Sequence, residues 1–481
     1  MISTTKTLLP IAFLSLLILA GCAKEKTNIS QPGSELKEVS SVSFKKANGD
    51  PFAASDIQVT IKVDSVLVKV PNGTELNGLT PEFGFKGKSI SPASGIPQNF
   101  NFPVKYTITA ENGSKASYTV AVNANPPANN NPDIVYFGSS DNNFYAVNAS
   151  TGQLVWKYSG TKSFVYSSAT YNNGVVYVGG IDDYVYAFDA LTGNIKWQYK
   201  MGTTGIESDA VYADGSIYVG CNDDYLVALD AATGQFKWSF MTGSNISASP
   251  TVANGTVYFG SSDGKLYALS TSTGQLKWAF PTGAMINQSG PALVDGVIYV
   301  GSRDTYLYAI DATTGTQKWR YATNGISLEQ SSPTVANGIV YIGGWYDVPG
   351  FTKKGSMYAV NATTGALVWE KLQNTGISSS PTVANGKLYI TTDDLNIYAL
   401  DAASGSTLWS KQVLANSASP AVSNGVVYVG GGGTHYFYAF DAATGAEKWR
   451  FSVPNGIMTS SPLIISSSND PHYSGDSGNY N

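Results

Sequence analysis

Short apolar segments alternate with polar turns throughout residues 134–465. In residues 175–215, three segments of about five residues combine β-branched and aromatic side chains with alternating polar positions, and a fourth follows at residues 208–212. Gly193 stands in one of the intervening tight turns, where a residue without Cβ adopts positive φ at little cost. No part of this region sustains an apolar period of 3.6 residues, so the pattern predicts antiparallel strands.

The same four-strand pattern recurs with a fixed period. A tryptophan marks each copy, and successive tryptophans are 40 or 41 residues apart, except for one interval of 50 residues. The eight tryptophans are Trp156, Trp197, Trp238, Trp278, Trp319, Trp369, Trp409 and Trp449. A repeat of this length with four antiparallel strands is typical of a propeller blade. The sequence therefore predicts an all-β chain with an eight-bladed β-propeller of four-stranded blades over residues 134–465.

The repeated tryptophan has a structural interpretation. An indole at the same point of every blade fills the wedge between neighbouring blades, and its ring N–H then needs an acceptor there. The small alanine before each repeated aspartate, such as Ala187 or Ala399, leaves room for the ring. We therefore expect the eight tryptophans to build the propeller and not to bind a ligand.

The two ends of the repeat region are out of phase. The first copy begins at Ile134 with its second strand, and the last copy ends with an unaccompanied first strand at residues 460–465. That C-terminal strand is predicted to join the first blade and close the ring, which leaves no open edge at the junction. Residues 466–481 are rich in Ser, Asn, Gly and Asp and are predicted to form a disordered tail.

The repeated phrase Tyr-Ala-x-Asp-Ala-x-Thr-Gly-x-x-x-Trp resembles the PQQ-like (pyrroloquinoline-quinone-like) propeller repeat. Residues 401–409 and 441–449 are close examples, whereas Val227 replaces the tyrosine in the third copy and Ser270 replaces the aspartate in the fourth. The resemblance implies the propeller fold. It leaves the function open, because the repeat occurs in quinoprotein dehydrogenases and in the propeller lipoprotein of the outer-membrane β-barrel assembly machinery.

Residues 1–21 resemble a lipoprotein signal peptide. Lys6 precedes an apolar stretch at residues 8–20 that is too short to span a bilayer, and residues 19–22 read Leu-Ala-Gly-Cys, similar to the bacterial lipobox. The resemblance implies cleavage before Cys22 and acylation of that cysteine, palmitate included, and several acyl chains together anchor a protein firmly. The residue after the cysteine is Ala23 and not aspartate, and by resemblance to enterobacterial sorting rules this favours the outer membrane. The sequence leaves open whether the protein faces the periplasm or the cell surface.

A separate all-β module is predicted between the anchor and the propeller. After a lipidated polar tether at residues 22–35, residues 57–63 alternate apolar and polar side chains, and Asn112-Gly113 has the composition of a hairpin turn. The pattern suits a small β-sandwich over residues 36–124, similar to the Ig-like modules of envelope lipoproteins. A polar, Pro-containing linker follows at residues 125–133.

The side chains offer little for catalysis or metal binding. The quinoprotein resemblance implies an adjacent Cys-Cys pair, a bound metal and long inserted loops, whereas this chain has only Cys22 and Cys221 as cysteines and only His435 and His472 as histidines. Aspartates recur in the turns, about one in each copy, which is too widely spaced to hold calcium, and turn aspartates bond their own backbone. These aspartates are Asp141, Asp182, Asp223, Asp263, Asp304 and Asp393. We predict no enzymatic activity, no metal site and no PQQ cofactor.

Two departures from the repeat are candidate binding sites. The sixth copy carries about nine extra residues within residues 343–355, and the eighth copy has an unusual loop at the equivalent place. In propeller topology these loops share a face with the entrances of the innermost strands, and loops on a rigid scaffold are favoured places for binding. The candidate residues are Trp345, Tyr346, Phe351, Lys353, Lys354 and His435 in the loops, and Tyr166, Glu207, Gln288, Glu329 and Gln330 at the entrances. The alternative is an insertion folded against its own blade.

These observations favour a non-catalytic, lipid-anchored protein of the cell envelope that binds partner proteins. The propeller lipoprotein of outer-membrane protein assembly is the functional analogue. A net charge of −5 without a cluster of basic residues argues against nucleic acid as a partner. A ligand- or glycan-binding lipoprotein that stacks sugars on Trp345 is the alternative, and a quinoprotein dehydrogenase is a more distant one.

Overall fold

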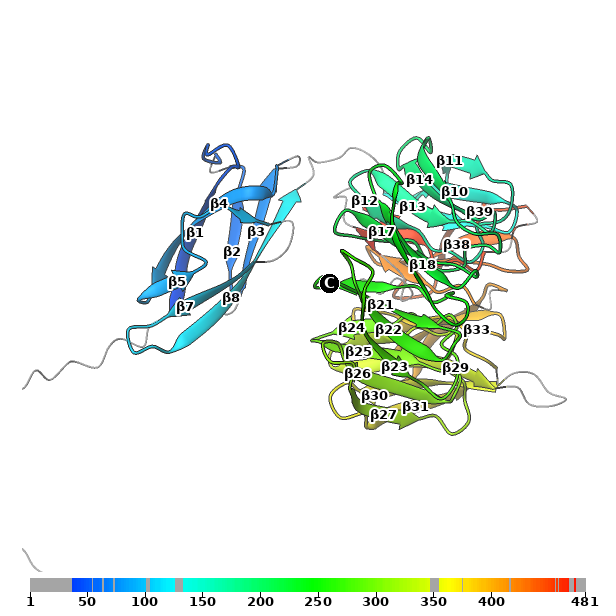
Figure 1. Cartoon of the computed structure of the whole chain (residues 1–481). Coiled ribbons are helices and arrows are strands. Elements are labelled where there is room, and N and C mark those ends of the chain that lie inside the picture. The colour runs from blue at the N-terminus through cyan, green and yellow to red at the C-terminus, as the bar shows by residue number, and fades with distance from the viewer. Residues whose placement is uncertain are drawn as a thin grey trace, which may run out of the picture. The chain divides into compact units, whose positions relative to one another are not determined.

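The computed structural model describes residues 37–125 and 133–466, apart from residues 54, 63–64, 72–73, 101–103, 347–353, 374, 415–416, 455 and 457, together with residues 471–472. The chain divides into two compact units between residues 127 and 128, and every regular element among the described residues is a β-strand (Figure 1). The part of the chain that the structure describes contains no helix with the length and hydropathy of a transmembrane span. Cys22 lies outside the described residues.

The N-terminal unit is a β-sandwich of two sheets. A three-stranded sheet has the order β1-β4-β6, and a five-stranded sheet has the order β2-β3-β8-β7-β5, in which β3 and β8 run parallel. The strands are β1 (Glu38–Lys45), β2 (Gln58–Ile61), β3 (Ser65–Pro71), β4 (Asn77–Lys86), β5 (Ser89–Ser91), β6 (Gln98–Asn99), β7 (Val104–Thr109) and β8 (Lys115–Asn125). The prediction of an Ig-like sandwich is confirmed.

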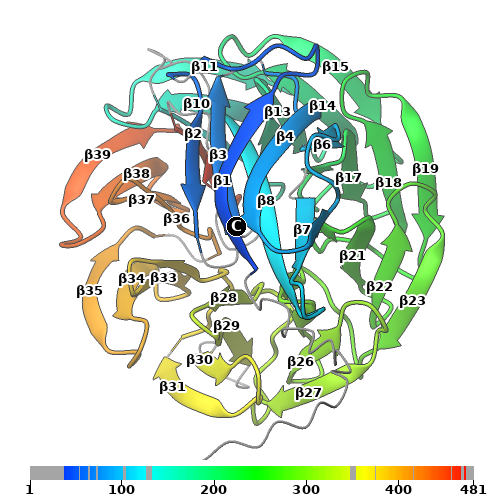
Figure 2. The same ribbon diagram turned by 90° about the vertical axis from the view of Figure 1, so that its left-hand side faces the viewer.

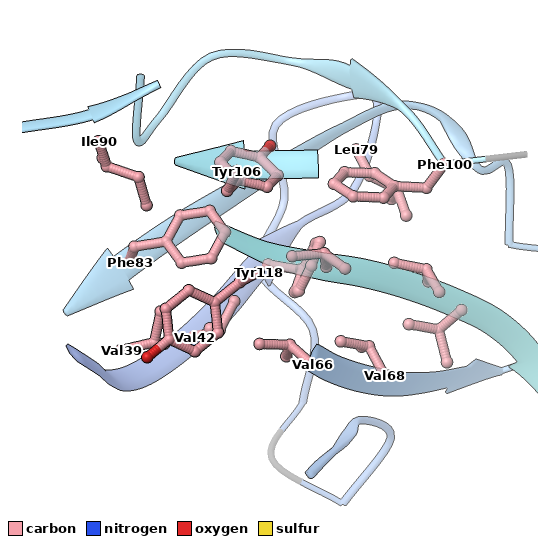
Figure 3. Packing of buried hydrophobic residues seen from close by; sticks show 14 of the residues in the cluster. Val39, Val42, Val66, Val68, Leu79, Phe83, Ile90, Phe100, Tyr106 and Tyr118 are labelled. Atoms are coloured by element: carbon pink, nitrogen blue, oxygen red, sulfur yellow. The ribbon is translucent and has the colours of Figure 1, made fainter. Parts of the chain in front are cut away.

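Alternating side chains from both sheets fill the space between them. Val66 and Val68 of β3 point into the same core as Phe83 of β4 and Tyr106 of β7 (Figure 3). Period-two alternation puts the intervening residues of each strand on the outer face of its sheet. Burial of the Tyr106 phenol in this apolar core raises its pKa to about 12.

The second unit is an eight-bladed propeller whose blades are numbered 1 to 8 in chain order. Seven blades are four-stranded sheets of consecutive strands, and blade 1 combines strands from the two ends of the repeat region. In blades 2 to 8 the first strand is innermost and the fourth is at the perimeter, as the positions of β15, β19, β23 and β27 show (Figure 2). The predicted fold class is confirmed.

The strands of the eight blades have similar lengths. The inner strands of blades 2 to 8 and then of blade 1 are β12 (Thr170–Asn172), β16 (Val211–Ala213), β20 (Thr251–Ala253), β24 (Ala292–Val294), β28 (Thr334–Ala336), β32 (Thr382–Ala384), β36 (Ala421–Ser423) and β40 (Leu463–Ile465). The second strands of blades 1 to 8 are β9 (Ile134–Gly138), β13 (Val175–Gly179), β17 (Ser216–Gly220), β21 (Thr256–Ser261), β25 (Val297–Gly301), β29 (Ile339–Tyr346), β33 (Lys387–Thr392) and β37 (Val426–Gly430). The third strands are β10 (Asn143–Asn148), β14 (Tyr184–Asp189), β18 (Tyr225–Asp230), β22 (Lys265–Ser270), β26 (Tyr306–Asp311), β30 (Lys354–Asn361), β34 (Asn396–Asp401) and β38 (Tyr436–Asp441). The outer strands are β11 (Leu154–Ser159), β15 (Ile195–Lys200), β19 (Phe236–Met241), β23 (Leu276–Pro281), β27 (Gln317–Ala322), β31 (Leu367–Gln373), β35 (Thr407–Gln412) and β39 (Glu447–Ser452).

The ring closes within blade 1. The C-terminal strand β40 pairs antiparallel with β9, with Ile465 opposite Ile134. The predicted closure by the last strand is therefore confirmed. A further short strand, β41 (Pro471–His472), pairs with the inner edge of β40, whereas the sequence analysis assigned these two residues to a disordered tail. The inner edge of β40 offers backbone groups to which such a segment can bond. Amino-acid composition alone cannot predict this pairing.

Consecutive blades are bonded through the same two donors. In blade 1 the indole N–H of Trp156 and the hydroxyl of Tyr136 both donate to the backbone carbonyl of Ala190 in blade 2, at 2.9 and 2.8 Å. The indole N–H groups of Trp197, Trp238, Trp278, Trp319, Trp369, Trp409 and Trp449 donate in the same way to the carbonyls of Ala231, Thr271, Ala312, Ala362, Ala402, Ala442 and Ala149. The last of these bonds joins blade 8 to blade 1, so the set runs around the whole ring.

The Thr-Gly part of the repeat is explained by the same contact. Gly193 in blade 2 has φ +71° and lies against the Trp156 ring, so that a Cβ added there would be 2.6 Å from the indole Cδ2 atom. Thr192 donates its backbone N–H and its hydroxyl to the Asp189 carboxylate, which fixes the turn. The turn between the third and outer strands is thus built to receive the tryptophan of the preceding blade.

Candidate binding face of the propeller

The turn from the second to the third strand and the connection to the next blade lie at the same end of every sheet, because all four strands are antiparallel. We call this end of the propeller the candidate binding face. The structure places Tyr166, Glu207, Gln288, Glu329 and Gln330 on the connections, and Trp345, Tyr346, Lys354 and His435 on the turns or the strand ends beside them. Phe351 and Lys353 lie outside the described residues.

A ring of buried hydroxyl groups surrounds the centre of the propeller just below this face. A proline or alanine stands directly before each inner strand. The residue before it is a serine in six blades, Asp209 in blade 3 and Gly290 in blade 5. In six blades the backbone N–H at this position donates to the side chain at the same position of the next blade, for example from Ser332 to Ser380 and from Ser380 to Ser419, both at 2.9 Å. These bonds tie neighbouring inner strands together and make the centre a rigid support.

The predicted entrance residues lie directly above that ring. Tyr166, Glu207, Gln288 and Gln330 each stand two residues before the ring position of their blade, where Tyr166 is exposed and the other three are half-buried. They come from blades 2, 3, 5 and 6, so the structure distributes them around the opening and does not gather them into one constellation. Glutamate, glutamine and tyrosine side chains in this arrangement give the opening a polar lining.

Glu329 differs from the other entrance residues because it is buried. Its backbone carbonyl accepts from the N–H groups of Gln288 and Ser289 in blade 5, both at 2.8 Å. Its carboxylate lies 3.9 Å from Nε of Arg303, whose side chain is largely exposed. Glu329 therefore joins blades 5 and 6. Arg303 could not be predicted as its partner from the repeat pattern, because the two residues lie on different blades.

The insertion in the sixth blade lengthens the sheet. Strand β29 continues past the usual end of a second strand, so that Trp345 pairs with Gly355 and Tyr346 with Lys354 on β30. Gly355 in turn pairs with Gln373, the additional last residue of β31. On the inner side, Trp345 and Ser327 exchange two backbone hydrogen bonds of 3.1 and 2.9 Å.

These pairings define an extension row of four residues across blade 6: Ser327, Trp345, Gly355 and Gln373. Trp345 and Tyr346 are half-buried parts of a strand, which fits the alternative of an insertion folded against its own blade better than a freely exposed aromatic lip. Ser327 lies two residues before Glu329, so the structure brings Trp345 close to the blade 6 entrance. It does not bring Trp345 to Tyr166, because blades 2 and 6 are opposite in a ring of eight.

His435 has a local role in the turn of blade 8. Its φ is +57°, its carbonyl accepts from Val453 N–H, and its Nδ1 atom lies 2.9 Å from the carbonyl oxygen of Gly456. The residue therefore bonds the turn to the connection that leads to blade 1. Among the described residues, none of these bonds joins His435 to another of the candidate binding residues.

The turn aspartates bond their own blade and the preceding connection. The Asp263 carboxylate accepts from Lys265 N–H at 3.1 Å, from the Tyr267 hydroxyl at 2.5 Å and from Gly243 N–H at 3.0 Å. In blade 7 the equivalent residue is Asp394, which accepts from the Tyr398 hydroxyl, so the assignment of Asp393 to this position was wrong by one residue. The described residues contain no group of three His, Cys, Asp or Glu side chains placed to hold a metal ion.

Cys221 is buried directly after β17. It packs with Ile217, Val219 and Val227, and burial raises the pKa of its thiol. A thiol in this state is a poor nucleophile, so the residue acts as a small apolar side chain.

The fold and the ring of inter-blade bonds define an eight-bladed propeller built from PQQ-like repeats. The chain belongs to the family described as outer membrane protein assembly factor BamB, which matches residues 106–208, 201–344, 284–376 and 353–477. Residues 50–122 of the sandwich match a second family, described as SGBP, N-terminal.

Curated relatives match part of the chain. The alcohol dehydrogenase (quinone) dehydrogenase subunit of Gluconobacter oxydans is 32% identical in a 133-residue alignment that covers 22% of this chain and 18% of that protein. BamB of Moranella endobia is 28% identical in a 137-residue alignment that covers 26% of this chain and 34% of that protein. The chain thus spans about a fifth to a third of the length of these relatives.

Solved structures share the fold. BamB from Moraxella catarrhalis superposes with a TM-score of 0.52 at 21% identity, over 62% of this chain and 88% of that one. The quinohemoprotein alcohol dehydrogenase from Comamonas testosteroni superposes with the same TM-score of 0.52 at 16% identity, over 62% and 68% of the two chains. These superpositions establish a common architecture, and at such low identities they leave the activity open.

Proposed function

We propose that this chain is a non-catalytic lipoprotein of the cell envelope, anchored to the outer membrane through Cys22, whose propeller binds partner proteins during outer-membrane protein assembly. Membership of the outer membrane protein assembly factor BamB family, and the similarity to BamB of Moranella endobia, support the assembly role. The observation that carries the proposal for this chain is the lengthened sheet of blade 6. Its outer strand β31 has a longer free edge than the six-residue outer strands of the other blades.

The free edge of β31 has the properties of a protein-binding surface. Its outer side offers unpaired backbone N–H and C=O groups, as every edge strand does. Leu367, Val368 and Leu372 are exposed beside that edge, with Leu372 64% exposed. Contiguous exposed apolar side chains on a soluble surface mark interaction sites.

Charged side chains that would block this edge are drawn away from it. The position before the blade tryptophan is a lysine in five blades. Lys237 and Lys318 at this position form salt bridges with Asp230 and Asp311, which end the third strands of their blades. In blade 6 the same position is Val368. Lys371 donates to the Gly405 carbonyl and the Thr407 hydroxyl of blade 7, so its charge is directed at the neighbouring blade. An edge strand without a free lysine is open to pairing with another strand.

The dehydrogenase relatives do not change the proposal. The first of them covers 22% of this chain, and the quinoprotein resemblance implies an adjacent cysteine pair. The sequence has two cysteines, Cys22 and Cys221, far apart along the chain. The proposal therefore assigns no quinone cofactor and no redox step to this chain.

The test is site-specific photo-crosslinking in intact envelopes, followed by mass spectrometry of the captured proteins. A photoreactive residue at Leu367 is compared with one at Leu276, because both stand two residues before a blade tryptophan and are 45% and 50% exposed. Capture of β-barrel assembly components from position 367 and not from 276 supports the proposal. If position 367 captures only glycan-uptake proteins, or no protein at all, the assembly role is wrong.

A further inference from the structure

The two sheets of the N-terminal sandwich carry charge in different ways. On the three-stranded sheet, Lys45 of β1 forms a salt bridge with Glu82 of β4 at 2.6 Å, and Lys86 of β4 forms one with Glu38 of β1 at 3.2 Å. Both lysines of that sheet are thus matched by glutamates on the neighbouring strand. Its outer face has no net charge from these four groups.

The five-stranded sheet has lysines and no acids. Strands β2, β3, β5, β7 and β8 contain no Asp or Glu residue. Val68 and Tyr106 point into the core (Figure 3), and Ala116 packs against it. Lys69, Lys105 and Lys115 are adjacent to these residues along the strands and therefore lie on the outer face. Lys62 follows β2 directly, and all four lysines are exposed. We call Lys62, Lys69, Lys105 and Lys115 the cationic face.

The register spreads these four charges over the whole sheet. The backbone N–H of Lys62 donates to the backbone carbonyl of Ser65. Ser65 pairs with Thr119 on β8, and Thr119 pairs with Lys105 on β7. Lys62 and Lys105 are therefore three strand spacings, or about 14 Å, apart. Lys69 and Lys115 lie four residues from this row in opposite directions along the strands, which separates them by about 26 Å. A spread of this size suits a flat anionic surface better than a single small anion.

The start of the described chain lies at one end of the cationic face. The Lys37 ammonium donates to the Ser114 hydroxyl at 3.0 Å, beside Lys115, and the Tyr118 hydroxyl donates to the Lys37 carbonyl. Fourteen residues separate Lys37 from Cys22. Even fully extended, such a segment reaches only about 50 Å, so an acylated Cys22 would keep the sandwich close to the bilayer.

We propose that the cationic face binds the anionic phospholipid headgroups of the membrane in which Cys22 is anchored. The inference rests on the proposed function for that anchor and adds to it a second, electrostatic contact that orients the sandwich. Lysines near an anionic bilayer each strengthen membrane binding by about fivefold, and the attraction is screened by salt. The exposed Leu67, on the same face between the lysines, contacts the headgroup region in this orientation.

The test follows each lysine separately. The full lipidated chain, purified from membranes, is added to preformed vesicles of phosphatidylcholine alone or mixed with phosphatidylglycerol, and exposed lysines are acetylated and quantified by mass spectrometry. We expect the acetylation rates of the cationic face to fall at least fivefold in the phosphatidylglycerol vesicles and to recover at high salt. Lys45 and Lys86 on the opposite sheet, and Lys157 on the propeller, serve as internal controls that do not change. Equal acetylation of the cationic face in both vesicles overturns the proposal.

A pair of variants with equal charge sharpens the test. In K69Q/K105Q/K115Q, Lys62 is expected to lose its protection, whereas in K157Q/K162Q/K411Q, which removes three exposed lysines of the propeller, it is expected to keep it. Protection of Lys62 in both variants would show that net charge, and not this face, is responsible, and would contradict the proposal. Co-flotation with phosphatidylcholine alone reports the acyl anchor, so a chain that floats only with phosphatidylglycerol contradicts the anchor and supports the face.

Discussion

The two ends of each blade differ in how closely they repeat. At the end that holds the turn between the third and outer strands, all eight blades receive the tryptophan of the preceding blade on the same backbone carbonyl and glycine. At the other end, the candidate binding face, the entrance residues change from Tyr166 to Glu207 to Gln288, and blade 6 alone is lengthened among the described blades. Internal repetition therefore marks the contacts that hold the ring together, and its interruptions mark the surface that is free to differ.

The largest expected effect comes from removing one inter-blade indole. Trp156→Ala deletes a buried ring and the donor to the Ala190 carbonyl, which should lower the free energy of unfolding by about 3–5 kcal/mol. Trp345→Ala, on the candidate binding face, removes a half-buried ring that is not one of the eight inter-blade indoles and should cost less. Thermal and denaturant unfolding of the two variants measures the difference. Equal losses would break the distinction between the two ends.

A pair of glycines sharpens the comparison within one blade. Gly193 and Gly174 both have positive φ, +71° and +80°, so alanine is strained at either position by about 1 kcal/mol. Only at Gly193 does the added methyl meet the Trp156 ring, at 2.6 Å, which adds a further cost of about 1–3 kcal/mol from overpacking. We expect Gly193→Ala to lower the unfolding midpoint more than Gly174→Ala. The same shift in both variants would mean that the indole contact contributes nothing.

The smallest effect concerns pH. The hydrogen bond from the Thr233 hydroxyl, followed by those from Lys237 and the Thr233 backbone, holds the pKa of Asp230 below its ordinary value of 3.8. A carboxyl with a lowered folded-state pKa stabilises the protein fully above its unfolded-state pKa and loses that contribution as the pH falls through the folded value. Thr233→Val should therefore reduce the stability that is lost below about pH 4, by about 0.5 kcal/mol for this half-buried group in contact with solvent. Unfolding midpoints measured at several pH values test this, and unchanged slopes would contradict it.

Much of the propeller is predictable from the sequence because each blade poses the same packing problem. The eight tryptophans appear at the one position where an indole meets the next blade, and the out-of-phase ends require closure by the C-terminal strand. Turn assignments are less secure: Asp393 and Asp394 are adjacent, and only the Tyr398 hydrogen bond shows which one fills the repeated position.

The candidate sites were harder to predict because they depend on contacts between distant segments. The extension row joins Ser327, Trp345 and Gln373 from three separate segments, so a loop seen in sequence becomes part of a sheet. The cationic face depends on the parallel pairing of β3 with β8, which sets Ser65 opposite Thr119. Neither register follows from periodicity, since alternation assigns a side chain to a face and does not choose the neighbouring strand.

The closure of blade 1 has a consequence for the order in which the chain is made. The Gly138 N–H donates to the Ser460 hydroxyl, 322 residues later, and β40 reaches its place only after every other blade has been synthesised. Until then β9 exposes a bare inner edge, and unpaired edges of this kind are where growing chains aggregate. The ring therefore stays open until the C-terminal strand has been made, and its circular form is the last property that the nascent chain acquires.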